Sequence, residues 1–252
     1  MKILSIGNSF SQDAHYYLHD MSVQEGHVLE CTNLYIGGCP LKLHWENALS
    51  EKEAYTLEKN GAAVPDHRPV SIREMLEADD WDVITLQQAS HDSGQYETYE
   101  PYLTELAGYV RSRAPQAQLM IQKTWAYELD SDHPEFARYG RSQEAMYEAL
   151  SDAYARAGAD IQAPLIPVGS VIQALRALPP FDYAHGGISL CRDGFHLSMT
   201  LGRYAAAAVW YMALVKERAE GKLIPECFSE EERKLVPCVL ETAERVLKDF
   251  RG

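Results

Sequence analysis

The sequence predicts an α/β fold in which a mainly parallel sheet of five strands lies between two layers of helices. Short apolar runs rich in β-branched residues alternate along the chain with longer stretches of helical period, which is typical of strand–helix–strand units. Across the 252 residues no repeat, low-complexity tract or Gly/Ser-rich linker marks a boundary. We therefore expect a single domain over residues 1–252.

Five apolar runs are the expected strands. Each is short and is bounded by polar residues, glycine or proline, as the strands of a buried sheet usually are. They cover residues 2–6, 28–36, 82–86, 117–122 and 160–168.

Helical stretches separate these runs, and several begin or end at residues that favour a helix terminus. Gly26 follows the first stretch, Pro101 lies in the first turn of the third, and Ser229 with Glu232 forms a capping-box pattern at the start of the last. The expected helices lie near residues 13–25, 70–79, 98–113, 134–157, 169–178, 199–220 and 229–250.

Two segments lie outside this alternation. Residues 39–69 have no clear period, and we interpret them as an irregular insertion that includes a small hairpin at Asn60–Gly61. The charge-rich end of the chain, about 229–250, is expected to be an amphipathic helix that packs on the body of the domain.

Composition excludes several classes of partner. Lys and Arg number 23 against 37 Asp and Glu, a formal charge of −14 that repels phosphate backbones and anionic lipids. We therefore expect neither nucleic acid nor a membrane as a partner. The five cysteines have no CxxC spacing, which disfavours a disulfide framework or a structural zinc site. The apolar run at the start is too short for a signal peptide or a membrane span, so a cytoplasmic location is expected.

Three residues with catalytic potential are predicted to meet at one edge of the sheet. Ligands bind beyond the carboxyl ends of the strands in open parallel sheets, and Ser9 comes directly after the first strand. A late loop places Asp193 and His196 three residues apart. Serine needs an adjacent base, and that base works best when a third group orients it. We expect Ser9 to be the nucleophile, His196 the base and Asp193 the orienting acid.

Ester hydrolysis also needs donors for the oxyanion of the tetrahedral intermediate. The backbone N–H groups of Ser9 and Gly38 and the side-chain amide of Gln88 follow three different strands, and together they form the predicted oxyanion hole. Gln87 is the alternative amide donor, because neighbouring strand residues point to opposite faces and the register is not fixed by sequence.

Further side chains at the same edge are candidates for contacts with substrate. His91, Trp125 and Tyr127 follow the third and fourth strands, and aromatic residues there suit stacking on sugars, although such residues also close cores. His15 and His19 have the four-residue spacing of a metal pair, but no third ligand is marked. We expect no metal and no organic cofactor, and the sequence does not indicate an oligomeric state.

Three short motifs resemble those of the SGNH hydrolases, also called GDSL hydrolases. GNSF at 7–10 resembles their first block, the glycine pair of LYIGG at 34–38 their second, and DGFH at 193–196 their closing DxxH. The chain is most similar to an uncharacterised bacterial branch of that superfamily, known mainly as a domain of unknown function. It departs from the superfamily at Asn8, where aspartate is usual, and in LQQASHDSG, which lacks the asparagine of the third block. The related sialate esterases use glutamine in a similar place, which favours Gln88.

The resemblance implies a three-layer, flavodoxin-like sandwich and a serine esterase that acts through an acyl-enzyme. The expected substrate is a small acyl ester, most often an acetyl ester of a carbohydrate. Two alternatives stay open: a lipid or thioester hydrolase, and a non-catalytic carbohydrate-binding protein on the same fold, the latter because the third-block asparagine is missing.

Overall fold

A computed structural model describes residues 1–251, and its centre is one sheet with strand order β4-β3-β2-β1-β5-β6-β7. Five neighbouring strands, in the order β2, β1, β5, β6 and β7, pair in parallel, and β1 lies between β2 and β5. The bounds are β1 (Lys2–Gly7), β2 (Glu30–Tyr35), β3 (Thr56–Lys59), β4 (Ala62–Ala63), β5 (Val83–Leu86), β6 (Gln118–Gln122) and β7 (Leu165–Ile166).

The predicted parallel core is confirmed, and its strand order is that of flavodoxin. Numbered among the parallel strands alone, the order is 2-1-3-4-5, so the direction of winding reverses between β1 and β5. Crevices for ligands form at this reversal, beyond the carboxyl ends of the strands. The segments after β1 and β5 are therefore the ones best placed to build a site.

The sheet has seven strands rather than five because residues 39–69 are not irregular. They contain α3 (Leu41–Leu49) and the hairpin of β3 and β4, whose first strand pairs antiparallel with β2. The predicted turn at Asn60–Gly61 is confirmed, and both residues have positive φ. A Cβ on Gly61 would lie 2.7 Å from Cα of Tyr16, so glycine lets this turn pack closely on the chain.

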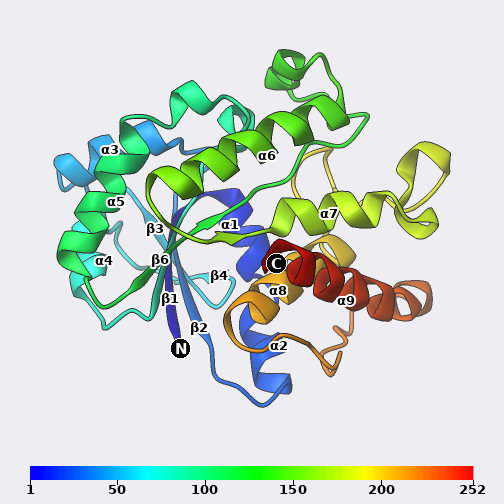
Figure 1. The fold of residues 1–252 in the computed structure, drawn as a ribbon. Helices are drawn as coiled ribbons and strands as arrows, with labels where there is room; N and C mark the ends of the chain where they lie inside the picture. Colours follow the sequence, from blue (N-terminus) through cyan, green and yellow to red (C-terminus); the bar gives the residue numbers. More distant parts are fainter. Residues whose placement is uncertain (252) are drawn as a thin grey trace.

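The helices form two layers around the sheet (Figure 1). Helices α3, α4 and α5 contact one another on one face, whereas α8 lies at the centre of a second group with α1, α2, α7 and α9. The first predicted helix is in fact two, interrupted at Tyr16 and Tyr17, and the fourth begins as a 3-10 turn at Pro134–Tyr139. The bounds are α1 (Ser9–His15), α2 (Leu18–Gln24), α4 (Ile72–Glu77), α5 (Tyr102–Arg113), α6 (Gln143–Asp160), α7 (Val168–Arg176), α8 (Leu201–Leu214) and α9 (Glu230–Arg251).

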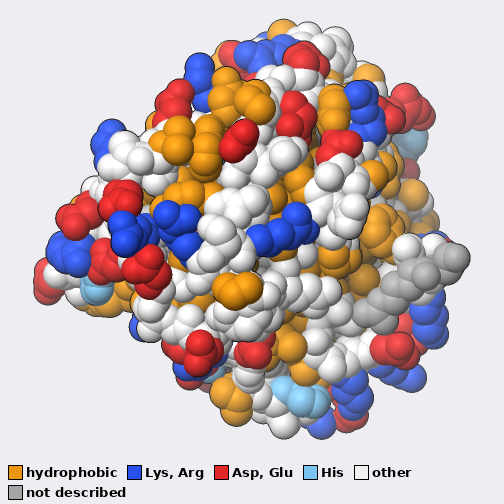
Figure 2. Space-filling model, turned by 60° about the vertical axis from the view of Figure 1, so that its left-hand side comes forward, with side chains coloured by type: hydrophobic (Ala, Val, Ile, Leu, Met, Phe, Trp, Pro, Cys, Tyr) orange, Lys and Arg blue, Asp and Glu red, His pale blue; other side chains and the backbone are white. Residues whose placement is uncertain are grey.

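Helix α8 is buried on nearly every side. Its run Ala205–Ala208 has no exposed surface, and small side chains there let neighbouring helices approach closely. Among the described residues, no helix combines the length and the apolar character needed to span a bilayer. On the face in Figure 2, Lys and Arg side chains are interspersed with Asp and Glu.

Candidate active site

Ser9 is the first residue of α1, and the preceding residue, Asn8, caps that helix. The side chain of Asn8 accepts a hydrogen bond from the N–H of Phe10 at 3.0 Å, and the hydroxyl of Ser11 accepts one from the N–H of Asn8 at 3.1 Å. These two bonds form a capping box. The hydroxyl of Ser9 is therefore not needed as a cap.

The structure brings Ser9, His196 and Asp193 together. Ser9 Oγ lies 2.8 Å from His196 Nε2, and His196 Nδ1 lies 2.7 Å from Asp193 Oδ2. The second carboxylate oxygen, Oδ1, accepts the backbone N–H of His196 at 2.8 Å. Because an ionised carboxylate can only accept, Nδ1 carries the imidazole proton and Nε2 is left to accept from the serine hydroxyl.

The surroundings of Asp193 favour its charged form. Partial burial raises the pKa of this carboxyl. Hydrogen bonds from the ring and backbone of His196 together lower the pKa by more than burial raises it, so it lies below its usual value. Asp193 therefore stays ionised at neutral pH and holds the imidazole tautomer that the pair requires.

Glycine at 194 gives the loop its shape. Gly194 has φ of +82°, and a Cβ there would lie 2.8 Å from Cα of Ser131. Its carbonyl accepts the N–H of Glu128 at 2.7 Å, so the loop between Asp193 and His196 packs directly on the segment that follows β6. A larger residue would displace this loop and His196 with it.

Two backbone groups are available as oxyanion donors. Within residues 1–251, neither the N–H of Ser9 nor that of Gly38 donates to another protein group. Gly38 lies on an exposed turn with φ of +62°, and Asn8 Nδ2 donates to the carbonyl of the next residue, Cys39, at 3.2 Å. The turn is thereby fixed beside the start of α1.

The prediction that Gln88 supplies a third donor is wrong in this structure. The buried Nε2 of Gln88 donates to both the carbonyl and the hydroxyl of Thr98, at 3.2 and 3.0 Å. Its Oε1 accepts the N–H groups of Leu41 and Ala89, at 2.9 and 2.8 Å. Both amide hydrogens are thus used, and Gln88 joins the start of α3 to the loop after β5.

The alternative donor, Gln87, is buried and uses one amide hydrogen within the core. Its Nε2 donates to Asn8 Oδ1 at 2.6 Å, and its Oε1 accepts from Gln122 Nε2 at 2.7 Å. Gln122 in turn accepts from Trp210 Nε1 at 2.7 Å. This buried chain of amides ends at Asn8, the residue before Ser9. Sequence reasoning missed Gln122 and Trp210, although Gln122 ends a predicted strand.

Trp125 and Tyr127 are fully buried, so the prediction that they contact substrate is wrong. Trp125 stacks on Phe10 with 4.1 Å between ring centroids, and its Nε1 donates to the carbonyl of Phe195 at 2.8 Å. The hydroxyl of Tyr127 lies 2.9 Å from Ser90 Oγ. Both rings are core residues that pack against Phe195, the neighbour of His196.

A row of half-buried rings extends from His196, and His91 is the last of them. A row runs from His196 to Phe195 (4.2 Å between centroids), to His133 (4.9 Å) and to His91 (6.3 Å). Burial lowers the pKa of His133, and the neighbouring His91 lowers it further. Sequence reasoning missed His133, which comes just before the 3-10 turn where the fourth helix was predicted to begin.

The two histidines with metal-pair spacing have different partners. His15 Nε2 lies 3.0 Å from Ser5 Oγ in the core, where burial lowers its pKa to about 3, and His19 Nδ1 lies 2.7 Å from the carbonyl of Leu29. The break between α1 and α2 separates them. No group of three or more His, Cys, Asp or Glu suited to a metal ion occurs among the described residues.

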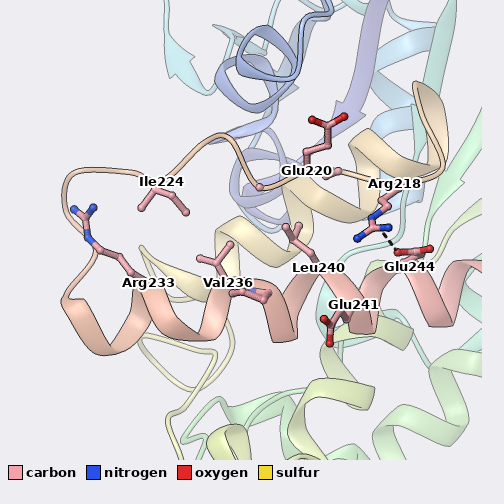
Figure 3. A pocket seen from close by; sticks show the side chains of 11 residues that line it. Arg218, Glu220, Ile224, Arg233, Val236, Leu240, Glu241 and Glu244 are labelled. Atoms are coloured by element: carbon pink, nitrogen blue, oxygen red, sulfur yellow. Dashed lines mark ion pairs between the residues drawn. The ribbon is translucent and has the colours of Figure 1, made fainter.

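A surface groove of about 460 Å³ lies elsewhere, between α9 and the segment after α8 (Figure 3). Apolar side chains such as Val236 and Leu240 line its floor, and an ion pair of Arg218 with Glu244 at 3.7 Å lies at one end. Its lining contains no serine, cysteine or histidine. The cluster of Ser9, His196 and Asp193 therefore lies outside this groove.

Comparison with known proteins agrees with the fold. The structure of a DUF4886 family protein from Bacteroides uniformis is 35% identical, with a TM-score of 0.89, over 98% of this chain and 94% of that one. A lipase/acylhydrolase from Enterococcus faecalis is 13% identical (TM-score 0.52; 84% and 94% covered). A mutant of an acetyl-xylooligosaccharide esterase from Geobacillus stearothermophilus is 12% identical (TM-score 0.51; 91% and 97% covered).

At 12–13% identity the last two structures share the fold alone. No curated protein matches the chain. The family described as a domain of unknown function, DUF4886, matches residues 2–239. Since that match covers nearly the whole sequence and a structure of the same family is similar over nearly its full length, the chain belongs to the DUF4886 family.

Proposed function

We propose that this protein is a serine esterase. The observation that carries the proposal is the continuous hydrogen-bonded path from Ser9 through His196 to Asp193, at 2.8 and 2.7 Å, beside the point where the winding of the sheet reverses. A hydroxyl, a correctly oriented imidazole and an ionised carboxylate in this order are what activation of a serine requires.

The steps use groups of this chain. His196 takes the proton of Ser9 as its Oγ attacks the ester carbonyl, and the N–H groups of Ser9 and Gly38 are proposed to stabilise the oxyanion. His196 then protonates the leaving alcohol, which breaks the ester bond and leaves Ser9 acylated. Water, deprotonated by the same imidazole, attacks the acyl-enzyme and releases the acid and free Ser9.

The rim of the site supports a polar alcohol in the substrate, and we propose a carbohydrate carrying a small acyl group, such as acetyl. His133 and His91 offer ring faces and nitrogen donors beside His196, which suits the hydroxyls and faces of a sugar. An esterase of acetylated xylo-oligosaccharides has the same fold. A lipid hydrolase needs a long apolar groove at its nucleophile, and the apolar groove of Figure 3 contains no residue of the triad.

The test is hydrolysis of an aryl acetate, an aryl octanoate and an acetylated xylo-oligosaccharide by the wild type and by Ser9→Ala. We expect the wild type to prefer the acetyl esters and Ser9→Ala to lose roughly 10³-fold or more in kcat. Equal rates for the two proteins would overturn the assignment of Ser9 as the nucleophile. A preference for octanoate would favour the lipid hydrolase instead, and binding of the sugar without turnover would favour the non-catalytic alternative.

A further inference from the structure

Asp13 lies four residues after Ser9 in α1, on the same side of the helix, and has no exposed surface. Its carboxylate accepts from two segments far away in the sequence. Arg192 Nη1 lies 3.0 Å from Oδ1, the backbone N–H of Leu197 donates to Oδ2 at 2.8 Å, and Arg203 Nε and Nη2 lie 2.8 and 2.7 Å from Oδ1.

The first two of these donors flank His196. Arg192 lies before the Asp193–His196 turn and Leu197 after it, and the turn closes on itself through an N–H of Arg192 that donates to the carbonyl of His196 at 2.9 Å. Both ends of the loop that carries the base are therefore tied to one carboxylate. That carboxylate belongs to the helix that carries the nucleophile.

Arg203 connects the same carboxylate to α8, the buried helix of the second layer. Because α1 and α8 pack against each other, the carboxylate that binds the loop is itself fixed between two packed helices. The distance between Ser9 and His196 thus depends on a short path through α1, Asp13 and the flanks of the loop.

Stability alone is a weak reason for such a cluster. Burying the carboxylate of Asp13 and the guanidinium group of Arg203 has a large desolvation penalty, and well-packed apolar side chains often stabilise a core as well or better. Ionic hydrogen bonds differ from apolar contacts in that they fix direction and distance. The cluster is therefore better explained by the geometry that it imposes.

We propose that Asp13 is a positioning residue that sets the distance between Ser9 Oγ and His196 Nε2. The inference rests on the proposed esterase function. Misplacing a reacting group by about 1 Å can lower a rate by roughly 10²-fold, whereas substrate binding at the rim does not depend on this distance. Loss of the carboxylate therefore lowers kcat and leaves KM nearly unchanged.

The experiment compares Asp13→Asn with Glu25→Gln as a matched control. Glu25 is also a buried carboxylate, and it accepts the N–H groups of Glu220 and Lys222 at 3.0 and 3.1 Å, away from the triad. Each change removes one buried charge at nearly constant volume. The readouts are kcat and KM for an aryl acetate, the rate at which a fluorophosphonate labels Ser9, and the NMR signal of the Nδ1 proton of His196.

We expect Asp13→Asn to lower kcat and the labelling rate by roughly 10²-fold, to change KM less than twofold, and to shift or broaden the His196 proton signal. Glu25→Gln should keep all three near their wild-type values. A folded Asp13→Asn with wild-type kcat and an unchanged His196 signal would overturn the proposal.

A milder variant covers the case in which Asp13→Asn does not fold. Arg192→Gln removes one donor from a side chain that is 29% exposed, and we expect it to lower kcat about tenfold at constant KM. A folded Arg192→Gln with unchanged kcat and His196 signal would contradict the proposal. If the wild type neither hydrolyses esters nor reacts with the fluorophosphonate, the esterase function fails, and the His196 signal alone decides the role of Asp13.

Discussion

At the scale of single residues, the capping of α1 and the contact with His196 are divided between the neighbours Asn8 and Ser9. Asn8 makes the capping bonds and also accepts from Gln87, while the hydroxyl of Ser9 lies against His196. If Ser9 capped the helix itself, its hydroxyl would accept a hydrogen bond from a backbone N–H. The division lets one short turn both start the helix and place a serine hydroxyl against His196.

Gln88→Leu tests the corrected role of this amide. The change leaves the N–H groups of Leu41 and Ala89 without their acceptor, so we expect the free energy of unfolding to fall by about 1–3 kcal/mol for each group that stays buried and unpaired. The kcat of the folded variant should change less than about threefold. Urea denaturation and hydrolysis of an aryl acetate measure the two effects. A loss of roughly 10²-fold in kcat at wild-type stability would restore Gln88 as an oxyanion donor.

At the scale of elements, β6, α6 and α7 meet around a buried lysine. Lys123 follows β6 and donates to Ser151 of α6 at 2.8 Å and to Ser170 of α7 at 3.0 Å. Burial lowers the pKa of Lys123 from 10.5 to about 8. The amine therefore keeps its proton less readily in the folded than in the unfolded chain.

The sign of the resulting pH dependence follows from proton binding. Between pH 8 and 10.5 the unfolded chain holds more protons at this site, so stability rises with pH across that window, and below it the full penalty is present. Lys123→Met should raise the free energy of unfolding at pH 7 by up to about 3 kcal/mol, since one pKa unit corresponds to about 1.4 kcal/mol. Urea denaturation at pH 7 and pH 10 measures the difference in the free energy of unfolding between Lys123→Met and the wild type. A difference that grows with pH would contradict a lowered pKa of Lys123.

At the scale of the whole molecule, the sheet topology determines where the site lies, and the net charge affects which substrates approach it. Ser9 follows β1 at the reversal, and the loop before α8 brings His196 to it. The formal charge of −14 gives the protein as a whole a negative field. Such a field slows the approach of anions and is screened by salt.

We expect kcat/KM for a neutral acetylated sugar to exceed that for an acetylated uronic acid by roughly tenfold at low ionic strength. The ratio should shrink in 1 M NaCl, where the Debye length falls to about 3 Å. Steady-state rates for the two esters at both salt concentrations provide the measurement. A ratio that does not respond to salt would show that contacts within the site, and not the overall field, cause the preference.

The sequence by itself determined the five parallel strands, the hairpin turn at Asn60–Gly61 and the meeting of Ser9, Asp193 and His196. Each of these depends on short-range signals: apolar runs, a turn dipeptide, a serine directly after the first strand, and the three-residue spacing of Asp193 and His196. The ends of parallel strands share one edge of a sheet, which placed Ser9 there, and the need of a serine for a base and an orienting acid linked it to Asp193 and His196.

Only the tertiary structure decided where the amides and rings point. Gln87 and Gln88 are adjacent, yet one binds Asn8 and the other Thr98, and Trp125 is buried by Phe10 while His91 stays at the rim. A side chain's burial and partners depend on packing between segments far apart in sequence, which no local pattern encodes. For the same reason, the contacts of Asp13 with Arg192 and Leu197 became visible only once the chain was folded.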